Sequence, residues 1–334
     1  KLIDTFKTPF FIDERGFFVT VSMGISVSER EGYDFDLMLK AADIAMYQAK
    51  ESGKNNYMFY DPEMDRKIKR RLLIEMNLRN ALDDEEFSLV YQPQILAKSG
   101  KVRGFEALIR WNNKELGQVS PLDFIPVAEE TGMIEKIGKW VIQSACETIR
   151  TINSVNGTDY IMSINVSPVQ ISNPFFLTDL YEIIQETGIK NEWVEIEITE
   201  NVFLANVEEV ISIILHLTSK GILISLDDFG TGYSSLSYLN KLPIDTLKID
   251  REFIRNLIHD KDDQKMVESI VLLAHKLGIF LVAEGVENQS QVRLLNDFSC
   301  DCIQGFYFSK PLQSDALLEL IESGNLDSEI KSKY

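Results

Sequence analysis

Eight short apolar runs, separated mostly by helical stretches, constrain the fold of this chain more than any other feature. Such runs are typical of buried parallel strands, because helices cover both faces of the sheet and polar alternation is not needed. The alternation predicts a parallel α/β fold, a TIM-like (β/α)8 barrel. An open doubly wound sheet is the competing topology, but no Gly-x-Gly-x-x-Gly turn supports it. The expected strands are Phe87–Tyr91, Val102–Ile109, Tyr160–Ile164, Val194–Ile198, Leu223–Leu226, Thr246–Ile249, Phe280–Ala283 and Cys302–Phe306.

The N-terminal region predicts a smaller α+β unit. Alternating β-branched residues predict a strand over Phe17–Val27, preceded by a hairpin turn at Asp13–Gly16. Apolar residues at helical spacing predict a helix over Phe35–Ser52, ended by Gly53, and a short strand follows at Tyr57–Tyr60.

A charged helix from about Glu63 to Asp83, without Gly or Pro, is expected to connect this unit to the barrel. We therefore expect a small N-terminal domain over 1–62, a connecting helix over 63–84 and the barrel over 85–326. Further helices are expected at Ile134–Ile152, Phe176–Thr187, Val207–Ser219, Lys265–Leu277, Gln289–Phe298 and Asp315–Ser323.

Composition excludes some classes of function. A length of 334 residues accommodates one barrel of roughly 250 residues and a smaller piece. The formal net charge of -18 argues against a DNA- or RNA-duplex binder, which needs a basic surface. An anionic substrate would therefore have to be received by metal ions and a few local cations.

Cysteine and histidine patterns exclude other sites. Cys146, Cys300 and Cys302 form no zinc or disulfide pattern, and the three histidines show no metal-ligand spacing. The stretch nearest to a membrane span, Ile270–Val282, is broken by His275, Lys276 and Gly278, so we expect no membrane contact. The chain starts at Lys1 without a signal peptide, and we expect a cytoplasmic piece of a longer protein that could carry a membrane anchor elsewhere.

The run Ile222–Leu226 stops at two adjacent carboxylates, Asp227 and Asp228, followed by a glycine-containing loop. At the exit of a buried strand both carboxylates can reach one ion cluster. Oxygen ligands favour Mg²⁺ or Mn²⁺, and a pair of such ions can act in phosphoryl transfer. A helix cap followed by a glycine turn is the alternative for this stretch alone.

Polar residues stand at the ends of the other strands as well. Active sites of α/β barrels lie at the carboxyl ends of the strands, so these side chains are expected to converge on one mouth. Crowded carboxylates repel one another unless cations neutralise them. Any single residue could instead be a cap or an ion-pair partner. The set comprises Glu106, Arg110, Asn165, Glu197, Glu200, Asp227, Asp228, Lys248, Asp250, Glu284, Glu287 and Gln304.

These residues lie in recognisable motifs: EALIRW at Glu106–Trp111, NVSPVQ at Asn165–Gln170, EITE at Glu197–Glu200, DDFGTGYSSL at Asp227–Leu236, LKID at Leu247–Asp250, AEGVE at Ala283–Glu287 and QGFYFSKPL at Gln304–Leu312. From about Leu72 to Leu320 the chain thereby resembles an EAL domain. This phosphodiesterase family hydrolyses cyclic di-GMP to linear pGpG in bacterial signalling. The N-terminal VTVSMGISV and AADIAMYQAKESGKNNY resemble the C-terminal half of a GGDEF domain, the diguanylate cyclase family. The Gly-Gly-Asp/Glu-Glu-Phe signature of the GGDEF family is missing from this chain, so we expect no cyclase activity from it.

The resemblance implies two divalent ions, Mg²⁺ or Mn²⁺, and in-line attack of an activated water on one phosphodiester phosphorus. The implied metal ligands are Glu106, Asn165, Glu197 and Asp227, with Asp228 and Glu284 completing the second ion's ligands. Glu106, Lys248 and Glu284 are the implied catalytic residues, with Lys248 holding or helping to activate the water.

The same resemblance implies contacts to cyclic di-GMP. Arg110 would bind a phosphate through its planar donor fork. The other implied substrate contacts are Gln92, Leu108, Asp228, Lys248 and Gln304. Glu200 would anchor the loop Phe229–Leu236, which in the family links metal binding to a homodimer interface between EAL domains. Each has a structural alternative: an ion pair for Arg110 or Lys248, a backbone contact for Gln304, a helix cap for Glu200.

Two other functions remain open. The chain could be a catalytically silent cyclic di-GMP receptor, but none of the motifs whose decay marks such receptors is decayed here. It could also be a regulatory interaction module that uses the GGDEF-like segment and the charged helix to transmit a signal.

Overall fold

The structure is a computed structural model that describes residues 2–6, 8–13, 15–28, 34–204, 207–230, 239, 242–324 and 326. The chain divides into two compact units, Lys1–Asn77 and Leu78–Tyr334. The division falls at the end of helix α3 (Pro62–Leu78), inside the segment expected to connect two domains.

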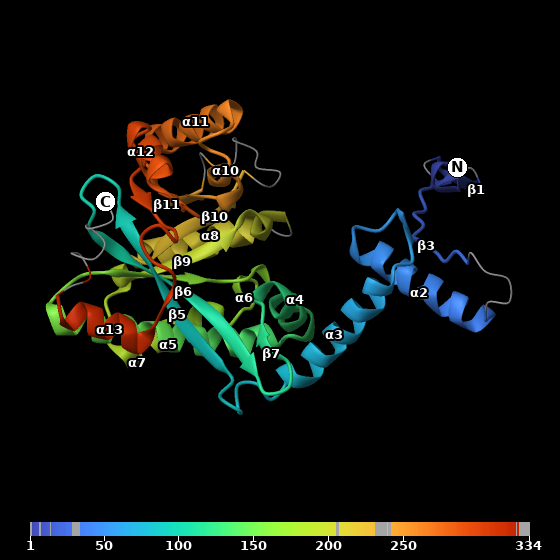
Figure 1. The fold of residues 1–334 in the computed structure, drawn as a ribbon, viewed down its shortest axis with the longest axis horizontal. Helices are drawn as coiled ribbons and strands as arrows, with labels where there is room; N and C mark the ends of the chain where they lie inside the picture. The colour runs from blue at the N-terminus through green and yellow to red at the C-terminus, as the bar shows by residue number, and fades with distance from the viewer. Residues whose placement is uncertain are drawn as a thin grey trace. The chain divides into compact units, whose positions relative to one another are not determined.

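In the first unit a helix packs against a small parallel sheet (Figure 1). An added Cβ at Gly24 would clash with the Ala42 carbonyl, so the absence of a side chain lets strand and helix approach this closely. A separate antiparallel hairpin precedes the sheet. The elements are α1 (Leu2–Thr5), the hairpin strands β1 (Phe10–Ile12) and β2 (Arg15–Phe17), the paired strands β3 (Met23–Ile25) and β4 (Tyr57–Phe59), and α2 (Phe35–Glu51) between them in sequence.

The expectations for this unit are partly confirmed. A hairpin turn follows β1, where Asp13 adopts the left-handed conformation with φ 45°. The single strand expected over Phe17–Val27 is wrong, because Phe18 and Val19 lie between β2 and β3, 78% and 45% exposed, and belong to neither strand. Alternation of β-branched residues marks a suitable strand, but a strand forms only where a neighbour pairs with it. Helix α3 ends at Leu78 rather than Asp83.

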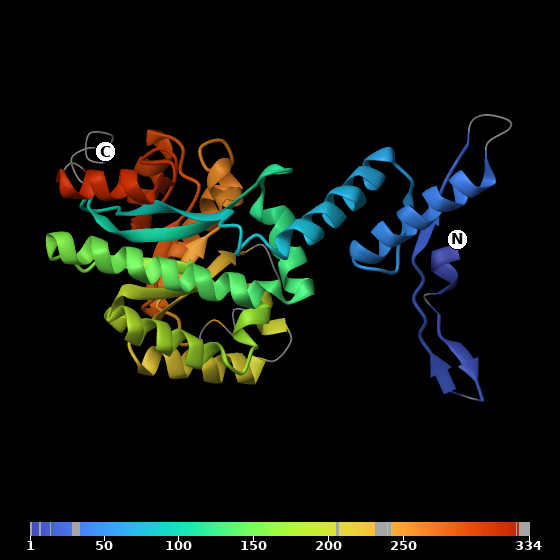
Figure 2. The same cartoon turned by 90° about the horizontal axis from the view of Figure 1, so that it is seen from below.

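In the second unit, eight strands close into a barrel, which confirms the expected fold class (Figures 1 and 2). All eight expected strands are present, with Thr246–Ile249 and Phe280–Ala283 at the expected residues. The barrel strands are β5 (Phe87–Leu96), β6 (Val102–Asn113), β8 (Ile161–Asn165), β9 (Val194–Thr199), β10 (Leu223–Phe229), β11 (Thr246–Ile249), β12 (Phe280–Ala283) and β13 (Cys302–Ile303).

The barrel departs from the all-parallel expectation at its first strand. β5 pairs antiparallel with its two barrel neighbours, β6 and β13, whereas the other seven barrel strands run parallel to one another. Residues 97–101 connect β5 to β6. This connection is too short for a crossover, which takes a dozen or more residues, so it can only form a hairpin.

Helices surround the barrel, and α5 packs beside β5 and β8 (Figure 2). The six expected helices all form; α4, α6 and α10 were not among them, and α4 forms although Pro126 lies in its interior. Within the described residues, no helix has the length and apolar character needed to cross a membrane. The helices are α4 (Pro121–Thr131), α5 (Met133–Asn156), α6 (Pro168–Ile171), α7 (Phe176–Thr187), α8 (Val207–Ser219), α10 (Arg251–Arg255), α11 (Lys261–Leu277), α12 (Gln289–Asp297) and α13 (Ser314–Glu322).

Candidate active site at the barrel mouth

Strand β9 shows how the barrel separates a polar interior from an aliphatic outer face. Glu195 and Glu197 alternate with Ile196 and Ile198, and all four residues are buried. Successive side chains of a strand point to opposite faces. The glutamates point inward, where they contact basic side chains from β6 and β11, and the isoleucines consequently point toward the helices.

The polar residues toward the carboxyl ends of the parallel strands are here called the upper layer. Lys248, which is fully buried, stands at its centre. The Lys248 ammonium lies 2.8 Å from a Glu197 oxygen and 2.5 Å from a Glu284 oxygen. It also lies 3.4 Å from Glu106 and 3.6 Å from Asp227. The upper layer consists of Glu106, Asn165, Glu197, Asp227, Lys248, Glu284 and Gln304.

Amide side chains from two other strands complete the surroundings of Glu106. Asn165 Nδ2 donates to Glu106 Oε1 over 2.8 Å, and Gln304 Nε2 donates to Glu106 Oε2 over 2.6 Å. The Gln304 amide also donates to Gln92 Oε1 over 3.2 Å. All seven side chains of the upper layer were expected on sequence grounds to meet at one mouth, and the structure brings them together.

One ammonium cannot neutralise four carboxylates, and the pKa values reflect this. Burial would raise the pKa of Glu106, but Lys248 and the two amides outweigh it and hold that pKa below its usual value. Burial and the Glu106 carboxylate raise the pKa of Glu197 well above its usual value. Burial raises the pKa of Glu284 to about 8, helped by Asp227 and Glu106 and opposed by Lys248. The layer therefore holds protons that a cation would displace.

Asp227 and Asp228 reach the mouth through an irregularity in β10. The register of β10 against β11 shifts between Leu226 and Phe229, and Asp228 has a φ of 56°. A non-glycine residue in this left-handed region is uncommon, and such conformations gather at functional sites. Burial and the Asp227 carboxylate raise the pKa of Asp228 to about 6, and its carboxyl group is hydrogen-bonded to Asp250.

The donor set fits divalent cations that prefer oxygen. Glu197 Oε1 and Gln304 Oε1 are buried and have no hydrogen-bond partner among the described residues. Within those same residues, no three acidic, histidine or cysteine side chains already surround a common point, because the carboxylates converge on the Lys248 ammonium. To hold cations, these carboxylates would rotate so that some of their oxygens face the ions instead of Lys248.

A groove of about 280 Å³ opens beside the upper layer. Glu106, Leu108 and Arg110 occupy alternate positions of β6 and all line it. Arg110 donates to its neighbour's carbonyl, Ile109 O, over 2.8 Å. Gln92, Glu284 and Gln304 line the same groove, so the expected substrate contacts other than Asp228 and Lys248 share one surface.

Two residues of the groove were missed by sequence reasoning. Arg251 follows directly on the LKID motif, and its place after a barrel strand was the available signal. Phe306 lies in the motif QGFYFSKPL and lines the groove, and the residue is 56% exposed. An exposed aromatic ring in a groove lined by two arginines is suited to stacking on a nucleobase.

Glu200 lies just beyond β9, and its Oε1 accepts a hydrogen bond from the Gly230 backbone N–H over 3.1 Å. This hydrogen bond is the part of the expected loop anchor that lies within the described residues. Residues 231–236 of the loop, which carry the rest of that expectation, lie outside the described residues.

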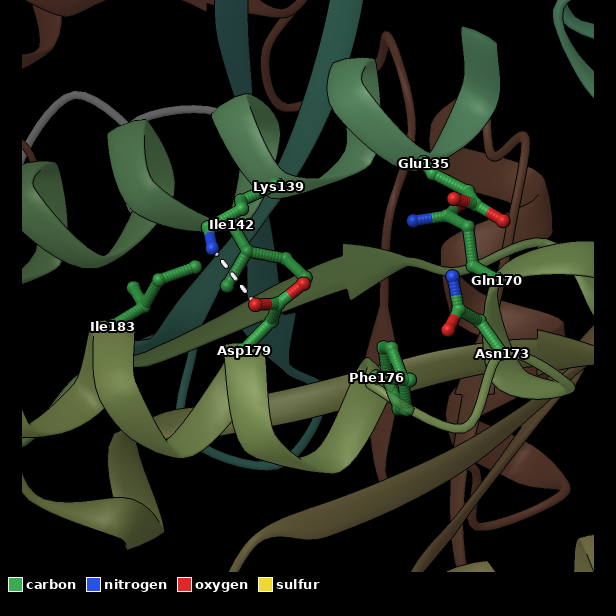
Figure 3. Close-up of a pocket in the computed structure, with 8 residues that line it drawn as sticks. All are labelled: Glu135, Lys139, Ile142, Gln170, Asn173, Phe176, Asp179 and Ile183. Atoms are coloured by element: carbon green, nitrogen blue, oxygen red, sulfur yellow. Dashed lines mark hydrogen bonds and ion pairs between the residues drawn. The ribbon is translucent and has the colours of Figure 1, made fainter. Parts of the chain in front are cut away.

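A second hollow lies between α5 and the α6–α7 segment (Figure 3). Its volume of about 30 Å³ has room for about one water molecule. The Lys139 ammonium and Asp179 Oδ1 pair across it over 2.8 Å. This hollow is too small for a nucleotide.

Comparison with known proteins identifies the family. The model of the EAL domain matches residues 75–311, and the model of the diguanylate cyclase GGDEF domain matches residues 1–56. The chain belongs to the EAL-domain family. Its first unit contains a short GGDEF segment without the signature motif.

Relatives of this EAL protein are named for cyclic di-GMP chemistry. The bifunctional diguanylate cyclase/cyclic di-GMP phosphodiesterase MucR of Pseudomonas aeruginosa is 35% identical, with 95% of this chain and 46% of MucR covered. The cyclic di-GMP phosphodiesterase PdeR of Escherichia coli is 35% identical, with 95% and 48% covered. The chain spans about half the length of these relatives.

A solved EAL structure supports the fold of the second unit. The PaMucR phosphodiesterase in complex with c-di-GMP is 37% identical and superposes with a TM-score of 0.71. The superposition covers 73% of this chain and 99% of that one.

Proposed function

We propose that this chain hydrolyses cyclic di-GMP to linear pGpG, using two Mg²⁺ or Mn²⁺ ions. The observation that carries the proposal is the convergence of four carboxylates on one end of the barrel, beside a groove of about 280 Å³ that contains two arginines. Membership of the EAL family and the names of MucR and PdeR support the substrate.

The ligands proposed for the ions are oxygens of the upper layer and of Asp228. The ions would lower the pKa of water and neutralise charge on the phosphoryl oxygens. The unpartnered Glu197 Oε1 supports this assignment, because a buried carboxylate oxygen without a donor favours a cation. The full set is Glu106, Asn165, Glu197, Asp227, Asp228 and Glu284.

The groove residues would bind and orient the dinucleotide. Arg110 and Arg251 supply positive charge for the phosphates of the ring, which the net charge of -18 does not provide elsewhere. Phe306 offers its exposed ring to a guanine. Gln92, Leu108 and Gln304 line the floor beside Glu106 and would fix the position of the reacting ester.

Lys248 would hold positive charge next to the reacting phosphorus. Burial would lower its pKa, but Asp227, Glu106, Glu197 and Glu284 raise that pKa well above the usual value, so the amine stays protonated. In the reaction, the oxygen of water bonds to phosphorus and one P–O3′ bond breaks. The released 3′ oxygen takes up a proton, and the ring opens to a linear dinucleotide.

The test is incubation of the chain with cyclic di-GMP and Mg²⁺ or Mn²⁺, followed by chromatography of the nucleotides. We expect linear pGpG from the unmodified chain, and none with EDTA or in Glu106→Ala. A Glu192→Gln variant, changed at an exposed carboxylate outside the groove, is the matched control. Binding of cyclic di-GMP without cleavage over a long incubation would instead make this chain a receptor.

We further propose the domain division 1–62, 63–84 and 85–326, a homodimer formed through the EAL domain, and a cytoplasmic location. Light scattering of the chain tests the dimer: we expect twice the mass of 38.2 kDa, and a monomer at all concentrations would overturn this proposal.

A further inference from the structure

A second polar layer lies inside the barrel beneath the upper layer. Its centre is an ion pair between Arg103 of β6 and Glu195 of β9. Arg103 Nη2 lies 2.7 Å from Glu195 Oε1, and Nη1 lies 3.0 Å from Oε2, so the guanidinium grips the carboxylate with both branches. Glu195 is fully buried, and 10% of the Arg103 side chain is exposed.

Three neutral side chains satisfy the remaining groups of this pair. Arg103 also donates to Gln94 Oε1 over 2.7 Å and to Thr246 Oγ1 over 3.2 Å. Glu195 accepts from Ser163 Oγ and Thr246 Oγ1, each over 2.6 Å. We call these five residues the lower layer: Gln94, Arg103, Ser163, Glu195 and Thr246.

Arg103 reaches the barrel interior through a bulge. Gln94 of β5 pairs with Gly104 and Ile95 pairs with Val102, which leaves Arg103 as an extra residue on β6. An added Cβ at Gly104 would clash with the Ile161 backbone of β8, so only glycine allows the strands to meet here. The sequence Arg103-Gly104 thus places a cation where a regular strand would not.

The two layers are linked residue by residue along the strands. In three strands, residues of the lower layer stand two positions before a residue of the upper layer on the same face: Ser163 and Asn165, Glu195 and Glu197, Thr246 and Lys248. The charges are linked as well, since Glu197 interacts with both Arg103 and Glu195. In the low-dielectric interior such interactions extend beyond hydrogen-bond distance.

We propose that the Arg103–Glu195 pair sets the cation affinity of the upper layer by keeping the layer beneath it electrically neutral. The inference rests on the proposed metal-dependent function. An unpaired Arg103 would repel cations from the site above it, and an additional carboxylate beside Arg103 would attract them. A pair that merely ties strands together would affect stability, but the sign of its charge would not matter for cation binding.

Two isosteric substitutions around Arg103 test the sign. Glu195→Gln removes one negative charge from the lower layer, and Gln94→Glu adds one at an oxygen that Arg103 already contacts. The readout is the Kd of Mn²⁺ for the metal-free full chain, measured by electron paramagnetic resonance of free Mn²⁺, with circular dichroism as the check on folding. We expect binding roughly ten-fold weaker in Glu195→Gln and several-fold tighter in Gln94→Glu.

The double variant Gln94→Glu/Glu195→Gln moves the carboxylate to the other side of Arg103 and keeps the layer neutral, so we expect a Kd within three-fold of the unmodified chain. The proposal is overturned if the Kd of Glu195→Gln exceeds that of Gln94→Glu by less than five-fold. It is also overturned if the Kd of the double variant differs from that of the unmodified chain by more than three-fold. If Glu195→Gln does not fold, Gln94→Glu must bind at least three-fold more tightly than the unmodified chain, or the proposal fails. If the unmodified chain binds no Mn²⁺, the metal-dependent function itself fails.

Discussion

The upper and lower layers of the barrel interior differ in how their buried carboxylates are balanced by basic side chains. In the lower layer one guanidinium meets one carboxylate, and neighbouring side chains satisfy the remaining groups of that carboxylate. In the upper layer four carboxylates share one ammonium, and Glu197 Oε1 is left without a donor among the described residues.

The difference distinguishes buried polar side chains that stabilise the fold from buried polar side chains that are placed for function. Burying an ion pair costs free energy unless its hydrogen bonds are complete, and the lower layer is built accordingly. The upper layer has more carboxylates than cations, and burial together with the crowding of these carboxylates raises the pKa values of Glu197, Asp227 and Glu284. An imbalance of this kind is expected where a protein reserves a site for cations.

The largest effect should come from Glu197→Gln, which removes one proposed ligand. We expect hydrolysis of cyclic di-GMP to fall roughly a thousand-fold. The free energy of unfolding of the metal-free chain should change by less than about 1 kcal/mol, because burial and the Glu106 carboxylate disfavour the charge on Glu197 that this variant removes. Activity assays and urea titrations measure the two quantities. A loss of several kcal/mol in the free energy of unfolding would show that the upper layer stabilises the fold as much as the lower layer does.

Breaking the lower layer should mainly affect stability. Arg103→Met leaves the fully buried Glu195 without its cation, and we expect the free energy of unfolding to fall by about 3–4 kcal/mol. The matched control is Lys139→Met, which breaks the exposed pair with Asp179 of Figure 3 and should cost less than about 1 kcal/mol. Equal losses in the two urea titrations would contradict the role given to Arg103.

The groove beside the upper layer should affect substrate binding alone. Phe306→Ala is expected to raise KM for cyclic di-GMP roughly ten-fold, with kcat within about two-fold, because base stacking contributes about 1–3 kcal/mol. Phe306→Tyr should retain the KM, and Phe175→Ala, at an exposed ring outside the groove, should leave both constants unchanged. A fall in kcat alone would show that Phe306 does not bind the base.

The smallest effect concerns Glu284 in the metal-free chain. Its pKa of about 8 lies above the usual value near 4.5, so the folded state keeps a proton that the unfolded state releases. Stability from this group is therefore full below about pH 4.5 and is lost as the pH rises toward 8. Glu284→Gln keeps the neutral form, so we expect its free energy of unfolding to fall less than that of the unmodified chain as the pH rises from about 4.5 to 9. Parallel pH profiles of the two would contradict this assignment.

The sequence predicted much of the fold because apolar runs reveal buried strands. The runs at Thr246–Ile249 and Phe280–Ala283 coincide with observed strands. The direction of β5 was missed because hydrophobic periodicity carries no information on strand direction. The short connection at 97–101 did carry that information, since it has no room for a crossover. Helix α4 was missed because Pro126 disfavours a helix interior, and packing of its buried Phe124 and Val127 overrides that preference.

The site was predictable where the residues stand in motifs at strand ends. Glu106, Asn165, Glu197 and Lys248 come together through the barrel topology. The inward position of Arg103 could not be predicted, because it depends on a bulge that shifts the register of β6. The convergence of the carboxylates on Lys248, rather than on a common empty point, likewise follows from three-dimensional packing alone.

The central claim is that the upper layer holds protons in place of cations. Titration of the metal-free chain with Mn²⁺ by calorimetry at pH 7, in two buffers of different ionisation enthalpy, tests it directly. Glu284 is largely protonated at this pH, so we expect Mn²⁺ to bind with release of protons and with a heat that differs between the buffers. Binding with the same heat in both buffers, or no binding at all, would contradict the account.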